Sequence, residues 1–398
     1  MKNKNKTIKE VLSRRVDRVL PDKASLEKLM GKKKIKLYLG IDPTGTRLHL
    51  GHSIALRKLQ EFADLGHEAI LIVGTGTVLA GDPSGRDKGR PKITQKEIKQ
   101  NIKTWKKQAG NILDFSKVKI RYNGDWLLKL SLGDIVNIAS NISAIQLFKR
   151  DMFQRRIKNG DTVWMHETLY PLLQGYDSVA LDVDLEIGGT DQIFNMLIGR
   201  ELQQKMNKRE KFILAIPMIL GVDGKQMSKS SGNCIWLLDS PKEMFGKLMS
   251  ISDNLIINYF ELLTDVPIAK INQYKKNLKG KKINPMVLKE ELAMEIVSIY
   301  HSKKEAQRAQ KEFNRIFREG KLPEKIEEVT IKEKSLNILD LLVKSKLTKS
   351  KSEAKRLIMQ GAVKIDEVPE TDWKKVIVIK KEQLLKAGKR KFVRIVKK

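Results

Sequence analysis

Two segments of the chain carry residue types suited to binding a polyphosphate. The first, residues 38–52, reads YLGIDPTGTRLHLGH, a β-rich run that passes through a Gly/Pro turn into a helical pattern. A helix start after such a turn presents unpaired N–H groups and the positive end of the helix dipole, which favour phosphate. His49 and His52 could add imidazole donors, although they could equally cap a helix or lie in a core, and a metal site would need a third ligand.

The second segment, residues 224–232, reads GKQMSKSSG and follows the first by about 175 residues. Lysines on a loop of Ser and Gly can close on a polyphosphate as point charges. Most stretches of this composition are only solvated loops. The second segment becomes informative together with the first, because a helix start and a lysine loop can bind the two sides of one phosphate chain.

Taken together, the two segments resemble the signature motifs of class I aminoacyl-tRNA synthetases. The HIGH-type motif matches Pro43, Thr44, His49, Leu50, Gly51 and His52, and the KMSKS-type motif matches Gln226, Met227, Ser228, Lys229 and Ser230. Two departures stand out. Gln226 replaces the first KMSKS-type lysine, with Lys225 one position earlier, and the apolar Leu39 and Ala55 stand where relatives often place polar ribose ligands. These departures predict weaker ATP binding without loss of activity.

Further segments resemble the tyrosyl enzymes of this class over nearly the whole chain. They are YPLLQGYD at 170–177, GGTDQ at 188–192 and GDPSG at 81–85, together with Tyr38. A phenolic hydroxyl in a closed pocket needs a donor and an acceptor, which Tyr38 and Asp177 would supply. Phenylalanine would leave both unpaired and be rejected strongly, a discrimination for which the tyrosyl enzymes are the established example.

The same resemblance implies roles for the remaining site residues. Asp82, Tyr170 and Gln174 would hold the α-ammonium group of tyrosine, with Gln192 near its carboxylate. The ATP-binding residues would be Gly40, Asp42, Gly51, Gly189, Asp191, Lys225 and Lys229, with Asp191 on the ribose hydroxyls. Singly, each has a structural reading: Tyr170 could be core, Asp177 a helix cap, and GDPSG a type I turn.

The implied chemistry is an in-line attack of the tyrosine carboxylate on the α-phosphate of ATP. The nucleophile is already ionised, so no general base is required, and the rate must come from positioning and charge stabilisation. Thr44 and His49 would donate to the γ-phosphate and His52 would lie near the ribose. Lys229, Arg86 and Arg90 would neutralise the departing pyrophosphate. Mg²⁺ would arrive with ATP, so we expect no tightly bound cofactor and no dedicated metal site.

The elements that must position these residues follow from the periodicity of residues 35–217. Short β-rich runs alternate with helical patterns, which predicts an α/β fold with a Rossmann-like parallel sheet. The expected strands are 35–41, 69–74, 118–122 and 212–216, and the expected helices include 53–65, 134–159, 191–206 and one that opens with a capping box of Thr94 and Glu97. The basic N-terminus is expected to form a helix.

We therefore expect a catalytic domain at 1–222 with its N-terminal helix, followed by the lysine loop at 223–233. Residues 234–321, which contain a capping box of Ser240 and Glu243 with Pro241 at the first helical position, are expected to be helical and, by resemblance, to bind the anticodon. A charged, strand-poor linker is expected at 322–334.

The last part of the chain, residues 335–398, resembles a small α+β S4 RNA-binding domain. Ser352 is expected to cap a helix that ends at Gly361, with Ala354, Leu357 and Ile358 facing inward. Lys351, Lys355 and Arg356 would face solvent and bind RNA, although a charged helix face can also be merely solvated. From residue 331 onward the chain holds 20 Lys and Arg against 8 Asp and Glu.

Composition agrees with a partner of this kind. The 398 residues carry 78 Lys and Arg against 47 Asp and Glu, a net charge of +31 that favours a polyanion, nucleic acid before an anionic membrane. The single cysteine, Cys234, excludes an internal disulfide and fits a reducing compartment. No run approaches the roughly 20 apolar residues of a membrane helix. We expect a soluble, cytoplasmic homodimer whose helices within 134–159 pair, and whose partners are tRNA(Tyr), tyrosine and ATP.

Three other functions are compatible with parts of this sequence. A tryptophanyl enzyme is disfavoured by Gln174 and Asp177 beside Tyr38. An RNA-binding paralogue with weakened catalysis is disfavoured by the full set of pocket residues, although Gln226 keeps it open. A dinucleotide-dependent oxidoreductase fails because Gly74 and Gly76 are followed by Gly81, too late for GxGxxG.

Overall fold

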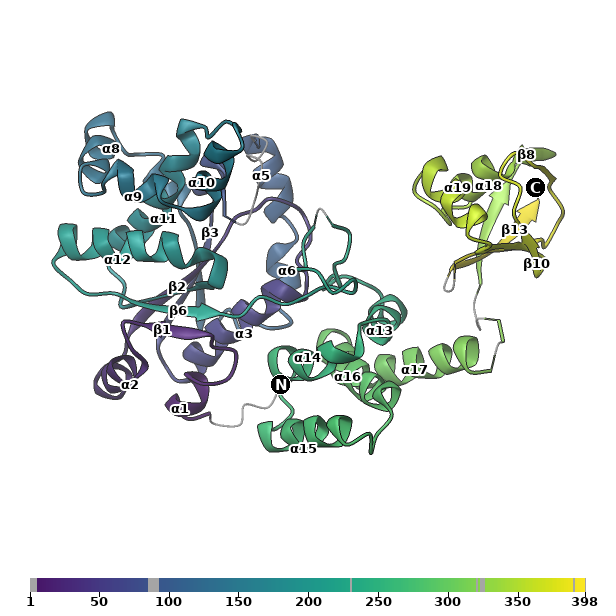
Figure 1. The fold of residues 1–398 in the computed structure, drawn as a ribbon, viewed down its shortest axis with the longest axis horizontal. Helices are drawn as coiled ribbons and strands as arrows, with labels where there is room; N and C mark the ends of the chain where they lie inside the picture. Colours follow the sequence, from purple (N-terminus) through teal and green to yellow (C-terminus); the bar gives the residue numbers. More distant parts are fainter. Residues whose placement is uncertain are drawn as a thin grey trace. The chain divides into compact units, whose positions relative to one another are not determined.

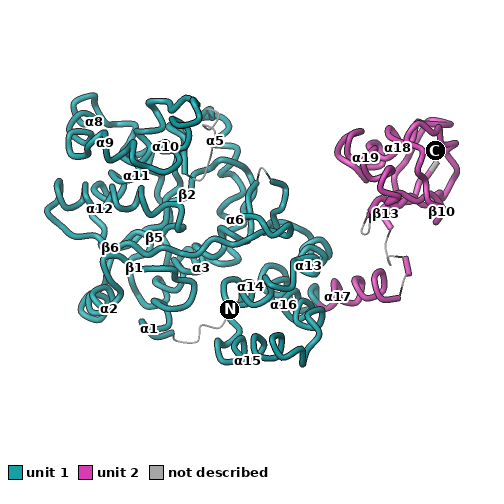
Figure 2. Tube along the Cα trace, viewed as in Figure 1, with its two compact units in different colours: residues 1–306 teal, residues 307–398 magenta. Residues whose placement is uncertain are grey.

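A computed structural model describes residues 6–84, 93–229, 231–319, 321–322, 326–388 and 391–397. The chain divides into two compact units, residues 1–306 and 307–398 (Figures 1 and 2). No helix in the described ranges is both long enough and apolar enough to cross a membrane. Each unit has its own sheet.

The first unit is built on a six-stranded sheet. Its strands are β1 (Arg18–Leu20), β2 (Lys36–Ile41), β3 (Glu68–Val73), β4 (Val118–Tyr122), β5 (Leu185–Gly189) and β6 (Phe212–Ile216), in the order β1-β6-β5-β2-β3-β4. All neighbouring pairs are parallel except the antiparallel edge pair of β1 and β6. This confirms the expected α/β fold with a parallel sheet.

The strand order reverses between β2 and β5. From β2 the chain winds outward through β3 to β4, whereas β5 and β6 lie on the other side of β2. At such a switch point the connections leave in opposite directions and open a crevice beyond the carboxyl ends of the strands. The HIGH-type segment follows β2 and the GGTDQ segment ends β5, so both reach this crevice.

Helices surround the sheet (Figure 1). In the order of the chain they are α1 (Ile8–Val11), α2 (Lys23–Lys32), α3 (Leu50–Asp64), α4 (Thr77–Ala80), α5 (Gln95–Ile102), α6 (Trp105–Ala109), α7 (Gly124–Leu127), α8 (Leu132–Ala139), α9 (Ala144–Phe148), α10 (Asp151–Lys158), α11 (Met165–Leu181), the 3₁₀ turn η1 (Thr190–Gln192) and α12 (Ile193–Asn207). The capping box of Thr94 and Glu97 is present at α5. Helix α3 buries Ile54, Leu56, Leu59 and Phe62 against the sheet, as its periodicity predicts.

The expected helical segment follows the lysine loop. It contains α13 (Pro241–Met249), η2 (Asp253–Leu255), α14 (Ile256–Leu263), α15 (Ile268–Lys279), α16 (Pro285–Tyr300) and α17 (Lys303–Phe317). The capping box of Ser240 and Glu243 opens α13, with Pro241 in its first turn. The helical prediction for this part of the chain is confirmed, and the strands 118–122 and 212–216 agree to the residue.

The N-terminal helix is shorter than expected. It consists of the four-residue α1, and the edge strand β1 follows it. The helix ends because Arg15, at φ 60°, turns inward, where its buried guanidinium donates to the Leu262 carbonyl and to Glu61, each at 2.7 Å. Tertiary hydrogen bonds to a buried cation outweigh the modest helix propensity of a short polar segment.

Two other predictions of the first unit need correction. The sequence did not predict strand β5, because its apolar run is short and Glu186 interrupts it. Residues 134–159 form parts of three short helices, α8, α9 and α10, with breaks at the polar residues between them. The predicted helix at 191–206 begins instead as η1 and continues as α12.

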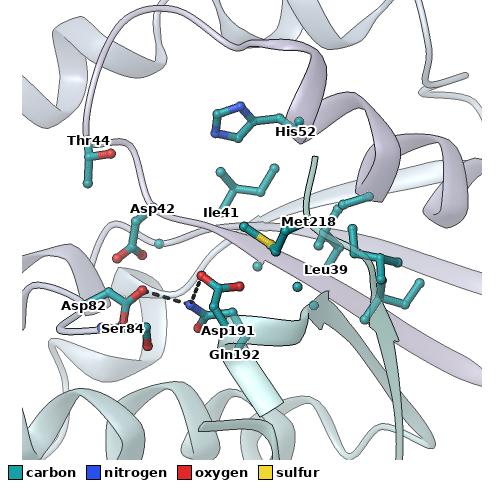
Figure 3. A pocket seen from close by; sticks show the side chains of 18 of the residues that line it. Leu39, Ile41, Asp42, Thr44, His52, Asp82, Ser84, Asp191, Gln192 and Met218 are labelled. Atoms are coloured by element: carbon teal, nitrogen blue, oxygen red, sulfur yellow. Dashed lines mark hydrogen bonds between the residues drawn. The ribbon is translucent and has the colours of Figure 1, made fainter. Parts of the chain in front are cut away.

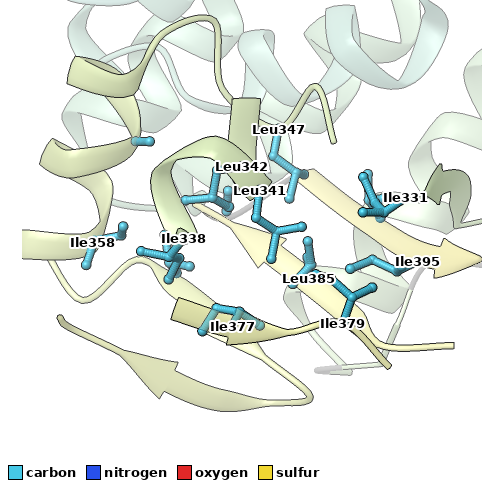
Figure 4. Close-up of a cluster of buried hydrophobic side chains, with 14 residues drawn as sticks. Ile331, Ile338, Leu341, Leu342, Leu347, Ile358, Ile377, Ile379, Leu385 and Ile395 are labelled. Atoms are coloured by element: carbon cyan, nitrogen blue, oxygen red, sulfur yellow. The ribbon is translucent and has the colours of Figure 1, made fainter. Parts of the chain in front are cut away.

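The second unit packs two helices against a five-stranded sheet. Its elements are β7 (Glu327–Ile331), β8 (Ser335–Asn337), α18 (Ile338–Lys344), α19 (Lys351–Met359), β9 (Val363–Ile365), β10 (Val368–Glu370), β11 (Val376–Val378), β12 (Leu384–Ala387) and β13 (Lys391–Lys397). The sheet order is β10-β9-β12-β13-β7, and β8 pairs with β11. Leu341, Ile358, Leu385 and Ile395 meet in its apolar core (Figure 4).

Two details of this unit differ from expectation. Strand β7 lies within residues 322–334, which we expected to lack strands, because its residues pair in parallel with β13. The cap of α19 is Ser350 and not Ser352: the Ser350 hydroxyl accepts from the Glu353 N–H at 3.2 Å, and the helix ends before Gly361, whose φ is 64°. Ala354 and Ile358 are buried as predicted, and Leu357 is partly buried.

Candidate active site

A cavity of about 1170 Å³ lies at the switch point of the sheet, beyond the carboxyl ends of β2 and β5. It brings together nineteen of the residues predicted for the site: Tyr38, Gly40, Asp42, Thr44, His49, Gly51, His52, Asp82, Tyr170, Gln174, Asp177, Gly189, Asp191, Gln192, Lys225, Gln226, Met227, Ser228 and Lys229. In Figure 3, His52 lies on one side of the hollow and Asp82, Asp191 and Gln192 on the other, with Asp42 between them. Single ligand pockets usually measure about 300–1,000 Å³, so this one has room for two small molecules.

The other predicted residues lie elsewhere. Pro43 and Leu50 belong to the same motif but do not line the cavity; Leu50 is fully buried and its N–H donates to the Ile235 carbonyl at 3.0 Å. Arg86, Arg90 and Ser230 fall outside the described residues. Lys351, Lys355 and Arg356 lie in the second unit, where Lys351 pairs with Asp340 at 2.7 Å and the Lys355 ammonium lies 3.9 Å from the ring centre of Trp373.

The two histidines shape the start of α3. His49 is the N-cap, and its Nδ1 accepts from the Gly51 N–H at 3.1 Å, while Nδ1 of His52 accepts from the His49 N–H at 3.2 Å. Since each Nδ1 is an acceptor, the proton of each neutral ring is assigned to Nε2. The capping role and the functional role are thus compatible, because the cap fixes the tautomer and leaves Nε2–H as a donor.

Burial keeps both rings neutral. It lowers the pKa of His49 to about 3, with the positive charge of Lys229 adding to the effect. It also lowers the pKa of His52 far below its usual value, assisted by His49 and Lys229. Both histidines are therefore uncharged near neutral pH, with Nε2–H groups that can donate a hydrogen bond.

These shifts predict an acid-labile fold. A histidine whose folded pKa is depressed stabilises the protein above its unfolded pKa of about 6.5, and this stability is lost as the pH falls toward 3. Between pH 6.5 and 5 we expect the free energy of unfolding to fall by up to about 1.4 kcal/mol per pH unit for each histidine. Urea unfolding of the parent and of His49→Asn, which can still cap, tests this; an identical pH slope for the two proteins would contradict it.

The lysine loop lies opposite this helix start. The Lys229 ammonium is 3.4 Å from the Thr44 hydroxyl and would be 3.4 Å from a Cβ on Gly45. Asn233 holds the loop: its Oδ1 accepts from the Ser228 N–H at 3.0 Å, and its Nδ2 donates to the Gln226 carbonyl, also at 3.0 Å. The loop thus places Lys229 beside the turn of the HIGH-type segment.

The opposite end of the cavity can bind a hydroxyl. Asp177 is 2% exposed and accepts from Asn123 Nδ2 at 3.0 Å and from Trp126 Nε1 at 2.9 Å. Burial raises the pKa of Asp177, and these two donors oppose the rise. Tyr38, 1% exposed, adds a hydroxyl that can donate or accept. The pair supplies the acceptor and the donor that a buried phenol requires.

A network of amides and one carboxylate lines the middle of the cavity. Asp82 Oδ1 accepts from the Ser84 N–H, and its Oδ2 accepts from Gln192 Nε2, each at 2.9 Å. Asn195 Nδ2 donates to Gln192 Oε1 and to Gln174 Oε1, each at 3.0 Å. The network fixes the orientation of both glutamines and leaves a carboxylate and amide groups suited to an ammonium and a carboxylate of a zwitterion.

Asp42 forms a second polar group at the end of β2. Its Oδ2 accepts from the Tyr170 hydroxyl at 3.0 Å and its Oδ1 from the Thr77 hydroxyl at 2.7 Å. The Asp42 carboxylate lies so close to the chain directly after β3 that only glycine fits there. A Cβ on Gly74 would lie 2.0 Å from Asp42 Oδ1. The sequence therefore uses Gly74 to make room for a carboxylate, not to bind a dinucleotide.

The sequence patterns did not indicate several residues of the site. Thr77, Asn123 and Glu186 line the cavity, and Trp126 and Asn195 contact side chains that line it. Two signals could have found some of them. Asn123 directly follows the predicted strand 118–122, at the sheet edge where ligands of parallel sheets bind. Glu186 is a charged residue within a buried strand, which requires a polar partner.

Known families match both parts of the chain. The family model described as tRNA synthetases class I (W and Y) matches residues 30–318, and the one described as the tyrosine–tRNA ligase SYY-like C-terminal domain matches residues 318–395. A tyrosine–tRNA ligase of Thermotoga maritima is 44% identical over 97% of this chain and 96% of its own. One from Moorella thermoacetica is 41% identical over 97% and 94%, respectively.

Solved structures show the same fold. The C-terminally truncated mitochondrial tyrosyl-tRNA synthetase of Aspergillus nidulans covers 78% of this chain and 94% of its own with a TM-score of 0.67, at 23% identity. The tyrosyl-tRNA synthetase of Archaeoglobus fulgidus, solved with L-tyrosine, covers 76% and 99% with a TM-score of 0.62, at 22% identity. These identities are too low to carry more than the Rossmann-like fold.

Proposed function

This chain belongs to the class I tRNA synthetase family of tryptophan and tyrosine enzymes and is a tyrosine–tRNA ligase, and on that premise we propose how its residues perform the reaction. The observation that carries the proposal is a single cavity in which a helix start and a lysine loop face a buried pair suited to a phenol. ATP and tyrosine would lie side by side in it.

Tyrosine enters with its ring toward β2 and α11. Its phenol would receive a hydrogen bond from Tyr38 and donate one to Asp177, its α-ammonium group would bind Asp82, Gln174 and the Tyr170 hydroxyl, and Gln192 would lie near its carboxylate. The hydrogen bonds already present at Asp82 and Gln174 support this assignment because they hold both side chains in place without a ligand. Such preorganisation lowers the cost of binding.

ATP binds across the start of α3 as its Mg²⁺ complex, so the metal comes with the substrate. Gly40, Gly51 and Gly189 would allow close approach of the nucleotide, Asp42 and Asp191 would bind near the adenylate, and Asp191 would bind the ribose hydroxyls. The Nε2–H groups of His49 and His52 can donate to phosphate and ribose oxygens. Lys229, with Lys225, Arg86 and Arg90, would supply the positive charge.

In the first step a tyrosine carboxylate oxygen attacks the α-phosphorus, and the bond from this phosphorus to the oxygen bridging to the β-phosphate breaks. Pyrophosphate leaves with that electron pair and tyrosyl-adenylate remains. No proton needs to be removed from the nucleophile, so the chain contributes alignment and charge neutralisation. In the second step a ribose hydroxyl of the 3′-terminal adenosine of tRNA(Tyr) attacks the tyrosyl carbonyl. The bond from this carbonyl to the phosphate oxygen breaks, AMP leaves with that electron pair, and the hydroxyl releases its proton.

The direct test is ATP–pyrophosphate exchange with tyrosine, tryptophan and phenylalanine as separate substrates. We expect exchange with tyrosine and at least a thousandfold lower kcat/KM with the others, since each leaves buried polar groups of the pocket unpaired. The tyrosyl enzymes are themselves the standard case of this discrimination. A folded protein without tyrosine exchange would refute the proposal, and exchange with tryptophan would redirect it.

We further propose that residues 234–321 bind the anticodon and that residues 335–398 form an S4-type RNA-binding domain. The excess of Lys and Arg over Asp and Glu from residue 331 onward supports this proposal, as does the exposure of Arg356 on α19. A cation-rich surface that neutralises phosphates releases counterions, so its affinity falls steeply with salt.

Raising the salt from 50 to 200 mM is therefore expected to weaken tRNA(Tyr) binding by about a hundredfold or more. Tyrosine activation should change only a few-fold over the same range, because its charges lie inside a cavity where screening is weaker. Fluorescence anisotropy with labelled tRNA and pyrophosphate exchange measure the two. Equal salt dependence of tRNA binding and tyrosine activation would contradict the proposal that most of the positive charge serves RNA binding.

A homodimer is also proposed, with an apolar surface on α7–α9 as its interface. Leu132 and Val136, four residues apart on α8, are 77% and 58% exposed. Leu128, just after α7, and Ile145, on α9, are 58% and 70% exposed. Exposed apolar side chains on neighbouring segments of the chain favour an interaction site, and a two-fold axis would place the same segments of a second copy against them. We place the enzyme in the cytoplasm, where translation consumes its product.

Val136→Glu is expected to convert the dimer into monomers, because a charge at the centre of an apolar interface would be buried without a partner. Sedimentation velocity at micromolar concentration measures this. Ile268→Glu, an exposed apolar position on α15, is the matched control and should leave the oligomeric state unchanged. A Val136→Glu protein that sediments like the parent would rule out this surface.

A further inference from the structure

A buried ion pair lies behind the phenol end of the cavity. Lys211, directly before β6, and Glu186, on β5, have side chains 0% and 2% exposed and contact each other closely. Burying two charges is costly unless further hydrogen bonds satisfy them. Here each has one: Glu186 Oε1 accepts from Gln174 Nε2 at 2.9 Å, and the Lys211 ammonium donates to the Ser178 hydroxyl at 2.8 Å.

The pair connects the two ends of the tyrosine site. Ser178 Oγ lies 3.0 Å from the Tyr38 hydroxyl oxygen, and Tyr38 and Glu186 are register partners on β2 and β5. One continuous chain of hydrogen bonds therefore runs from Gln174, proposed to bind the α-ammonium group, through Glu186, Lys211 and Ser178 to Tyr38. We call these five residues the pocket relay.

The fold makes room for the ammonium of Lys211. Helices α11 and α12 pack closely at two glycines, since a Cβ on Gly175 would lie 3.1 Å from the Gly199 Cα. A Cβ on Gly199 would in turn lie 2.5 Å from the Lys211 nitrogen and 3.1 Å from Ser178 Oγ. The space is therefore shaped for this cation, which distinguishes the pair from an accidental burial.

The chemistry of the donors gives the relay a direction. An ammonium can only donate, so Ser178 Oγ accepts from Lys211. Its own hydroxyl proton can then go to the Tyr38 oxygen. Two further acceptors lie near Tyr38. The main-chain carbonyl of Gln174 is 3.5 Å away, too far for a strong bond, and the Glu186 carboxylate already accepts from Gln174 and Lys211. Tyr38 consequently keeps its proton for a ligand in the cavity.

We infer that Lys211 is a positioning residue that acts through Ser178 to make Tyr38 the hydrogen-bond donor to the substrate phenol, and through Glu186 to orient Gln174. The inference rests on the proposed placement of the phenol between Tyr38 and Asp177. Lys211 does not touch tyrosine. It sets which proton the pocket offers and so contributes to the rejection of phenylalanine.

The first test is Ser178→Ala, which leaves the ion pair in place and cuts the relay before Tyr38. The readout is the ratio of kcat/KM for tyrosine to that for phenylalanine in pyrophosphate exchange. We expect this ratio to fall about tenfold, through a higher KM for tyrosine at an unchanged KM for ATP, since one oriented hydrogen bond is lost. A ratio within twofold of the parent's would overturn the inference.

The second test separates positioning from stability. Lys211→Met alone leaves Glu186 buried and unpaired, and we expect a lower Tm or failure to fold. The double variant Lys211→Met/Glu186→Gln removes both charges and should recover the Tm while keeping the tenfold loss of discrimination. Full recovery of discrimination in the double variant would show a purely structural pair and overturn the inference. Lys36→Met, on the same sheet but outside the relay, is the control.

Tyr38→Phe distinguishes failure of this inference from failure of the proposed site. It removes the donor itself and should lower the discrimination ratio at least as much as Ser178→Ala does. If Tyr38→Phe discriminates like the parent, the placement of the phenol is wrong. If Tyr38→Phe loses discrimination but Ser178→Ala and the double variant keep it, the site stands and the relay is refuted.

Discussion

Asp177→Ala is expected to lower kcat/KM for tyrosine by about 10³–10⁴ in pyrophosphate exchange. The substitution removes the charged acceptor proposed for the phenol, worth about 1.5–3 kcal/mol, and strips Asn123 Nδ2 and Trp126 Nε1 of their acceptor at a cost of about 1–3 kcal/mol each. Part of the cost of the two unpaired donors is also present in the free enzyme and does not affect kcat/KM. We therefore expect transition-state stabilisation to fall by about 4–6 kcal/mol, and about 1.4 kcal/mol corresponds to a tenfold change in kcat/KM. Phenylalanine should not gain, because the site stays polar.

Asp177→Asn provides the graded comparison. It keeps one oxygen for the Trp126 donor but sets an amide NH₂ near Asn123, and it lacks the charge. We expect a loss between those of the parent and Asp177→Ala. Asp64→Asn, which removes a surface carboxylate paired with Lys117 at 2.8 Å, should leave exchange unchanged. An Asp177→Ala protein with parental melting behaviour and activity within tenfold of the parent would disprove the assignment.

The parts of the fold that the sequence predicted well depend on local signals. Strands 118–122 and 212–216 and the capping boxes at Thr94 and Ser240 agree with the structure because apolar runs and cap side chains act within a few residues. The length of the N-terminal helix could not be predicted, for the opposite reason. The side chain of Arg15 binds Glu61 and a carbonyl of α14. This carbonyl is more than 240 residues away along the chain, so no local sequence pattern can indicate the contact.

The same division holds within the site. Residues in contiguous motifs, such as His49 and Lys229, could be selected in advance, and the structure brings them to one cavity. Asn123 follows a predicted strand and could have been selected too, but its bond to Asp177 and the role of Trp126 depend on β4 lying two strands from β2 in the sheet. Glu186 was missed for a related reason: an isolated charge in a strand identifies no partner until Lys211 is placed beside it.

Lys229→Ala is expected to lower kcat for tyrosine activation by about 10²–10³ while the dissociation constant for tyrosine changes less than threefold. Negative charge moves toward pyrophosphate as the bond to the α-phosphate breaks, and a fixed cation there stabilises the transition state more than the ground state. Lys229 is placed for this role, 3.4 Å from the Thr44 hydroxyl and opposite the neutral histidines of α3. Single-turnover kinetics give kcat, and equilibrium dialysis with tyrosine alone gives the dissociation constant.

Lys225→Ala is the informative comparison, because Gln226 leaves Lys225 as the nearest replacement for the missing lysine. Its side chain is exposed at the rim of the cavity, and its backbone carbonyl is engaged by the Gly221 N–H at 2.7 Å. A flexible, hydrated ammonium loses more entropy on reaching the phosphate than one already held beside Thr44. We therefore expect a loss of no more than about tenfold, mainly in KM for ATP. If Lys229→Ala weakened tyrosine binding as much as it slowed activation, Lys229 would be a structural support of the cavity, and the charge that drives pyrophosphate departure would have to come from another residue.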